Sequence, residues 1–140
     1  MNCKQFLHLT LICAIGITTA WAGSNWRQHV SDTDRTRTNP YSGQSQAVAA
    51  GARLYGEHCA QCHGNDALGM ATKPSLRTKS VRDLTDGELW WLMKNGSRPR
   101  GMPSWNSLPA PSRWQIITYV KSLGASGTAK PSSREQEERQ

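Results

Sequence analysis

Apolar residues recur at helical spacing in three segments of this chain. In residues 47–59 they stand three or four positions apart, and residues 85–96 and 112–124 each carry an apolar run that closes on a glycine. Such spacing gathers side chains on one face of a helix. Strand signals are poor throughout the sequence. The pattern therefore predicts an all-α fold with short helices over these three segments.

Capping signals mark where the two later helices are expected to begin. Thr85 is followed three residues on by Glu88. Ser112 stands in the same relation to Gln115. This is the spacing of a capping box at a helix N-terminus, and the glycine that closes each segment predicts the helix end. The prolines between the segments exclude one long helix and predict an ordered loop: Pro99, Pro103, Pro109 and Pro111.

Polar stretches flank this helical region on both sides. Residues 23–46 show almost no apolar periodicity, so we expect a flexible lead-in in which Trp26 makes only a loose surface contact. Residues 125–140 run through Ser, Lys, Glu, Arg and Gln without a hydrophobic face, which predicts a disordered tail. The folded domain is therefore expected over residues 47–124.

The first 22 residues have the features of an export signal. Lys4 precedes an apolar stretch over residues 6–17, and the tripeptide Ala-Trp-Ala at 20–22 offers a cleavage pattern before Gly23. The apolar stretch is short for a hydrocarbon core of ~30 Å. We therefore expect a cleaved signal peptide over residues 1–22, a periplasmic protein and no membrane span in the mature chain. An uncleaved signal anchor is the alternative.

Size and charge narrow the class of protein further. A chain of 140 residues is too short for a multidomain enzyme or a multispan membrane protein. Its net charge is +7. A basic domain often binds nucleic acid, but export makes that partner unexpected. Three short helices bury too little apolar surface to be stable alone, so we expect a disulfide, a metal or a cofactor to stabilise the fold.

The sequence Cys59-Ala60-Gln61-Cys62-His63 is the candidate site for that stabilising group. C-x-x-C-H is the attachment signature of a c-type haem. Each thiol can add across one vinyl group of the haem, and the following imidazole can bind its iron. A single motif of this kind predicts one covalently bound haem c.

Two other chemistries compete for the same cysteines. A thioredoxin-like redox pair would want a βαβ context and a helix that begins at the motif, whereas here a helix ends there and Gly64 follows. A structural zinc site needs four ligands, and after signal cleavage only His29 and His58 remain as further donors. A c-type haem requires neither a βαβ context nor a set of four zinc ligands.

The sixth iron ligand decides between electron transfer and ligand chemistry. Met93 lies inside an apolar helical segment and is expected in the core. Met70 lies close to His63 in the sequence, and so short a connection makes it hard for Met70 to reach the opposite face of the haem. Met102 lies in a polar loop between Gly101 and Pro103. We therefore expect His63 and Met102 to be the axial ligands.

These motifs resemble those of a class I bacterial cytochrome c, the single-haem soluble type, over residues 47–124. The resemblance implies a small fold of three to four short helices wrapped around one covalently attached haem. It also implies that Gly51 and Tyr55 of the first helix cross Ile116 and Tyr119 of the last.

The same resemblance implies a partner for the axial histidine and a function. The carbonyl of Pro74 would accept a hydrogen bond from His63. The segments 84–91 and 101–105 are similar to cytochrome domains that serve periplasmic dehydrogenases and oxidases. The implied activity is outer-sphere electron transfer, because a His/Met-ligated iron leaves no position for a substrate. The protein itself would not be an enzyme.

Charge gives an expectation about partners. Arg98 and Arg100 flank the Met102 loop and would border the exposed haem edge, where they would steer an acidic redox protein: a periplasmic dehydrogenase, a terminal oxidase or another cytochrome. We expect a monomer. Two alternatives stay open: a ligand-binding or sensing haem protein with an open sixth position, and a fixed cytochrome subunit of a dehydrogenase complex.

Overall fold

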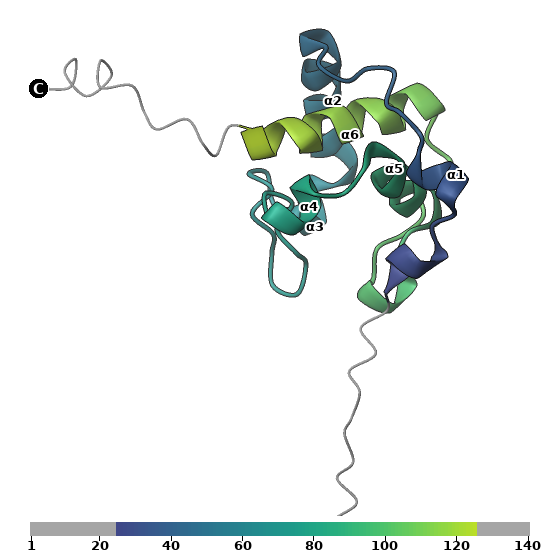
Figure 1. Cartoon of the computed structure of the whole chain (residues 1–140). Helices are drawn as coiled ribbons and strands as arrows, with labels where there is room; N and C mark the ends of the chain where they lie inside the picture. The colour runs from purple at the N-terminus through teal and green to yellow at the C-terminus, as the bar shows by residue number, and fades with distance from the viewer. Residues whose placement is uncertain (1–24, 126–140) are drawn as a thin grey trace, which may run out of the picture.

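The computed structural model describes residues 25–125, and all regular structure within them is helical (Figure 1). The predicted all-α fold is confirmed. The signal peptide predicted over residues 1–22 lies outside the described residues, and so does the tail predicted over residues 125–140 apart from Ala125, which is the last residue of the final helix. The helices in chain order are η1 (Trp26–His29), α1 (Asp32–Arg35), α2 (Ser45–His58), α3 (Ala60–His63), α4 (Lys79–Arg82), α5 (Asp86–Asn95), η2 (Arg98–Arg100) and α6 (Ala110–Ala125).

The two longest helices, α2 and α6, cross at close range (Figure 1). A Cβ at Gly51 would overlap the main-chain carbonyl of Gln115, so only glycine allows this approach. One turn further along α2, the ring of Tyr55 packs against Tyr119 with their centroids 5.2 Å apart. The crossing implied by the resemblance is confirmed. It fixes the C-terminal end of α2, where the cysteine motif begins.

Local capping defines α5 at both ends. The Thr85 side chain accepts a hydrogen bond from the Glu88 amide, and the Glu88 carboxylate accepts one from the Thr85 amide. This is the predicted capping box. At the other end Gly96 takes a φ of +70° and stops the helix. Trp90 of α5 stacks on Trp114 of α6, with ring centroids 4.2 Å apart, and joins the two helices.

The bounds of α6 differ from those predicted. The helix begins at Ala110, so Ser112 lies inside the first turn and does not cap it. Pro111 is tolerated there because the first amides of a helix have no partner within it. The helix also continues through Gly124, which lies against the side chain of Arg82 and does not end the helix.

Residues 25–46 differ from the expected flexible lead-in, because they fold onto α5 and α6. Gly87 of α5 lies against the carbonyl of Asp34, leaving no room for a Cβ. The buried Asn39 amide donates to the Trp114 carbonyl at 3.2 Å and to the Thr118 hydroxyl at 2.9 Å. These contacts are polar and distant in sequence, so hydrophobic periodicity contains no sign of them.

Trp26 also differs from its expected role as a loose surface contact. Its ring is half-buried, packs against the hydrophobic core and stacks on Trp91 with centroids 6.1 Å apart.

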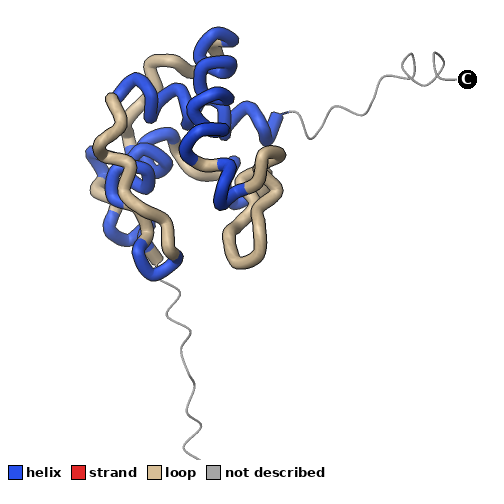
Figure 2. Tube along the Cα trace, turned by 180° about the vertical axis from the view of Figure 1, so that it is seen from behind, coloured by secondary structure: helices blue, strands red, loops and turns tan. Residues whose placement is uncertain are grey.

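Seen from behind, the loop of residues 64–78 extends away from the helices (Figure 2). Within residues 25–125, no helix combines the length and the hydropathy needed to cross a membrane.

Candidate functional site

A cavity of about 530 Å³ lies among α3, α5, α6 and the two loops of residues 64–78 and 96–109. Pockets for cofactors and drug-sized ligands usually measure ~300–1,000 Å³. The cavity wall is largely apolar, as a flat hydrophobic group requires. Side chains of this wall include Leu76, Leu89, Met93, Ile116, Ile117 and Val120.

The end of α2 brings the cysteine motif to the cavity. Cys59 follows α2, and both Cys62 and His63 lie on the short α3. All three line the cavity. Gly64 ends α3 with a φ of +79°, where a side chain would be strained and would meet Asp66. The chain turns away there, and the motif stays at the cavity wall.

The two thiols differ in environment. Cys59 is partly buried and Cys62 is exposed, and both are free. Burial, together with the neighbouring Cys62, raises the pKa of the Cys59 thiol to about 11. A thioredoxin-like redox pair would also need a βαβ context, and the residues that the structure describes contain no strand. The structure therefore does not favour the thioredoxin-like alternative.

A hydrogen bond orients the His63 ring. Its Nδ1 lies 2.9 Å from the carbonyl oxygen of Pro74, and a carbonyl can only accept. Nδ1 is therefore the protonated nitrogen, and Nε2 keeps the lone pair that a metal needs. The intervening loop is closed by the Gly69 amide, which donates to the His63 carbonyl at 2.9 Å. Gly69 has a φ of +88° and lies against the Lys73 carbonyl, so glycine is required there as well.

A second loop brings Met102 to the same cavity. Ser97 and Met102 form an isolated antiparallel bridge, with N–O distances of 2.9 and 3.1 Å in the two directions. Gly96 and Gly101, both with positive φ, make the turns that allow this bridge. Met102 lines the cavity.

The other two methionines have different positions. Met93 is buried in α5 and also contributes to the cavity wall, in addition to its expected place in the core. The Met70 side chain is 52% exposed and lies outside the cavity lining. Of the two loop methionines, the structure therefore brings only Met102 to the cavity that contains His63.

Polar groups on the cavity wall were only partly foreseen. Arg100 lines the cavity, while Arg98 on the same short helix does not. Lys73 also lines it, and its ammonium donates to the Arg100 carbonyl at 3.2 Å. Ser97 also lines the cavity, and its buried hydroxyl has no hydrogen-bond partner among the described residues.

Arg27 is a cavity residue that the sequence did not reveal. It lies on η1, outside the segment expected to fold, and still lines the cavity. No spacing or composition signal connects it with the cysteine motif. In contrast, Lys73 is adjacent to Pro74, so attention to the neighbours of that proline could have identified it.

The residues around this cavity fit a c-type haem. Two free cysteines, an imidazole with an available Nε2 and a thioether line one apolar cavity, and Lys73 and Arg100 are polar residues of the same wall. His/Met donors are those of electron-carrying haem proteins. Apolar walls suit the ring, and polar groups suit its carboxylates.

Comparisons with known proteins give a consistent result. Residues 46–120 match the family model described as cytochrome c oxidase, cbb3-type, subunit III. The chain is similar to cytochrome c550 of Pseudomonas aeruginosa, with 31% identity over 107 residues that cover 72% of this chain and 69% of that protein.

Two larger proteins contain a similar segment. Quinohemoprotein alcohol dehydrogenase ADH IIB of Pseudomonas putida is 35% identical over 85 residues, which are 59% of this chain and 12% of the dehydrogenase. The cbb3-type cytochrome c oxidase subunit FixP of Azorhizobium caulinodans is 28% identical over 102 residues, 69% of this chain and 34% of that subunit. The chain therefore corresponds to a small part of each.

Proposed function

Because this chain belongs to the cytochrome c family, as a bacterial class I cytochrome c, we propose that it transfers single electrons through one haem c. Family membership implies a covalently bound haem c and a role in electron transfer. The proposed attachment residues are Cys59 and Cys62, and the proposed axial ligands are His63 and Met102. The observation that supports this arrangement is that all four line one cavity.

Each of these residues has a defined task in the proposal. Haem iron between an imidazole and a thioether supplies reversible one-electron chemistry at a comparatively high potential. Cys59 and Cys62 would add through sulfur to the vinyl groups of the haem and would hold it in the cavity. Pro74 keeps the His63 ring in place through the 2.9 Å hydrogen bond, and Met102 would supply its sulfur as the other iron ligand.

The proposed reaction moves electrons and breaks no bond. The protein accepts one electron from a reduced donor and passes one electron to an oxidised acceptor, so it returns to its starting state. We place it in the periplasm, after cleavage of residues 1–22, as a monomer and not as an enzyme. A dehydrogenase-type donor and an oxidase-type acceptor are consistent with the named relatives.

Charge at the cavity supports an acidic partner. Lys73 and Arg100 are both wall residues, and Arg98 is an exposed neighbour on η2. Complementary charge accelerates encounter and is screened by salt. We expect the rate of reduction by an acidic donor to fall with ionic strength. Arg100→Gln should weaken this salt dependence, whereas the exposed Arg53→Gln, outside the cavity lining, serves as the control.

A second candidate is a fixed subunit of a larger redox complex. It is favoured by the matches to short segments of a dehydrogenase and an oxidase subunit, in which such a domain is part of a longer chain. Purification of the native protein separates the two: a carrier elutes alone, and a subunit elutes with its complex.

One optical experiment tests the proposed function directly. The protein is isolated from the periplasmic fraction, its intact mass is measured, and its reduced spectrum is recorded with and without carbon monoxide. The mass should correspond to a chain beginning near Gly23 with one haem added, and carbon monoxide should leave the spectrum unchanged. Ready binding of carbon monoxide would instead support the ligand-binding alternative with an open sixth position.

A further inference from the structure

The segment that precedes the family match contributes to the cavity. Trp26 and Arg27 lie on η1 and line the cavity, although the matched region begins at residue 46. We propose that the Arg27 guanidinium, held at the cavity wall by Glu88, is a fixed positive charge that raises the reduction potential of the bound haem. This inference rests on the proposed function, since it concerns the same cavity.

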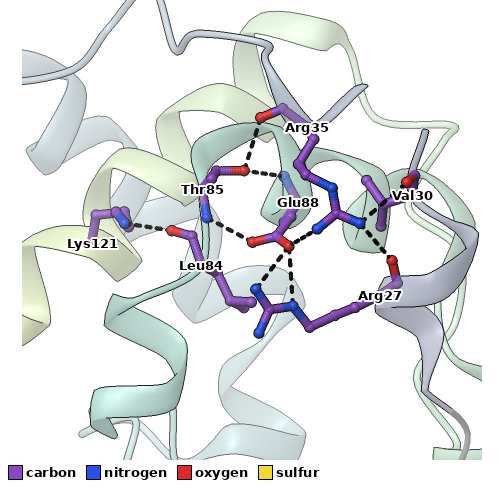
Figure 3. Close-up of polar contacts among 7 residues, drawn as sticks. All are labelled: Arg27, Val30, Arg35, Leu84, Thr85, Glu88 and Lys121. Atoms are coloured by element: carbon purple, nitrogen blue, oxygen red, sulfur yellow. Dashed lines mark hydrogen bonds and ion pairs between the residues drawn. The ribbon is translucent and has the colours of Figure 1, made fainter. Parts of the chain in front are cut away.

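Glu88 holds the Arg27 guanidinium with one carboxylate oxygen. Its Oε1 accepts from Nε of Arg27 at 3.0 Å and lies 2.9 Å from Nη2 (Figure 3). The other oxygen, Oε2, accepts from the Thr85 amide at 2.9 Å. The Glu88 side chain is only 1% exposed and sits at the start of α5. The arginine is therefore attached to a rigid part of the core and not to a surface loop.

Arg35 fixes the backbone that carries Arg27. Its guanidinium pairs with the same oxygen of Glu88, and its Nη2 donates to the Arg27 carbonyl at 2.9 Å and the Val30 carbonyl at 3.3 Å (Figure 3). Arg35 does not line the cavity. It is a positioning residue, whereas Arg27 alone of the two brings its charge to the cavity.

The sign of the effect follows from electrostatics. Oxidised haem carries one more positive charge than reduced haem, so a neighbouring cation disfavours the oxidised form and raises the potential. Arg27 is 49% exposed, so solvent screens part of its field. We therefore expect a moderate effect: about a threefold change in the ratio of oxidised to reduced protein at a fixed potential. For a one-electron couple this is roughly 28 mV, since tenfold is ~59 mV.

Arg37 provides a matched control on the same segment. It is 48% exposed and pairs with Asp34 at 2.8 Å, and it does not line the cavity. Arg37→Gln therefore removes the same charge at the same exposure from a different place. Arg27→Lys retains the charge but not the paired hydrogen bonds, and so separates charge from packing.

The experiment is a redox titration of the haem-loaded protein at low ionic strength. Arg27→Gln should lower the midpoint potential by about the threefold equivalent, and Arg27→Lys should restore most of it. Arg37→Gln should stay close to wild type. Equal shifts for Arg27→Gln and Arg37→Gln would overturn the inference, as would a shift in Arg27→Lys as large as that in Arg27→Gln.

Two provisions keep the result decisive. If Arg27→Gln gives no haem-loaded protein, Arg27→Met removes the charge with a side chain that can still pack, and the same shift is expected. A wild-type protein without covalent haem in its intact mass would contradict the proposed function. A haem-loaded protein whose potential ignores Arg27 would contradict only the role of Arg27.

Discussion

The backbone of Gly51 on α2 lies against the main-chain carbonyl of Gln115 on α6, with no space for a Cβ between them. This contact sets how closely the two longest helices approach. Because Cys59 follows directly after α2, and because α6 supplies Ile116 and Ile117 to the cavity, the same contact sets the width of the site. A change at Gly51 should therefore affect both stability and the cofactor cavity.

Gly51→Ala should destabilise the protein by about 1–3 kcal/mol, because the added methyl group forces two backbones apart. Gly56→Ala is the matched control on the same helix, since a Cβ there meets nothing within 4 Å. It should be neutral or stabilise by roughly 0.5–1 kcal/mol, as alanine favours helix. Denaturant unfolding of both variants measures the difference, and equal stability would contradict the role assigned to the crossing.

The parts of the fold that were predicted from sequence depend on local interactions. The capping box of Thr85 and Glu88 joins residues three apart, and the stop at Gly96 needs only its own backbone angle. The cysteine motif is likewise contiguous. Such features leave a fixed spacing in the sequence, so spacing alone was enough to find them.

The parts that were missed depend on distant polar contacts. Arg27 reaches Glu88 across 61 positions, and Asn39 reaches Thr118 across 79. Hydrogen bonds between such residues require no apolar pattern, so residues 25–46 were expected to be flexible. The start of α6 was misplaced for another reason: Pro111 suits the first turn of a helix as well as a loop.

Glu88 should make stability depend on pH. Burial alone would raise its pKa, but hydrogen bonds from the Thr85 amide and Arg27, with the charges of Arg27 and Arg35, hold the pKa below its usual value. A lowered pKa in the folded state means that the stabilisation is complete above the unfolded pKa of ~4.3 and is lost as the pH falls through the folded pKa.

Glu88→Gln should therefore cost about 1.5–3 kcal/mol near neutral pH, the usual worth of a hydrogen bond to a charged group. The variant and wild type should converge as the carboxyl becomes protonated in acid. Thermal unfolding from pH 3 to 7 measures both curves. Asp83→Asn is the control: its pKa is lowered by the hydrogen bond from Lys79, but the pair is exposed and should change the melting temperature little. A constant difference between wild type and Glu88→Gln at every pH would contradict the assignment.

Removal of both proposed attachment cysteines should cost most of the folded protein. Cys59→Ala with Cys62→Ala would leave a cavity of about 530 Å³ without its covalently held occupant. The cost follows because a ligand that binds only the folded state stabilises it and the small helical core cannot compensate. Far-ultraviolet circular dichroism during heating gives the result. Full helicity at a wild-type melting temperature would show that the fold does not depend on covalently bound haem for its stability.

Met102 separates an electron carrier from a ligand-binding haem protein. If its sulfur is the sixth ligand, the wild-type ferric spectrum contains a sulfur-to-iron band, and Met102→Ala removes that band and opens the position to carbon monoxide. Met102→His should keep the site closed but lower the potential, since a thioether favours ferrous iron more than imidazole does.

Two methionine variants serve as controls for that experiment, and their positions make them unequal. Met70→Leu should leave the spectrum unchanged because the side chain is exposed outside the cavity. Met93→Leu is the stricter control, because Met93 lines the same cavity from α5 and a conservative change there keeps the packing. Loss of the sulfur band in Met93→Leu, with the band retained in Met102→Ala, would identify Met93 as the ligand. In that case the bridge between Ser97 and Met102 would serve to close the cavity and not to bind the iron.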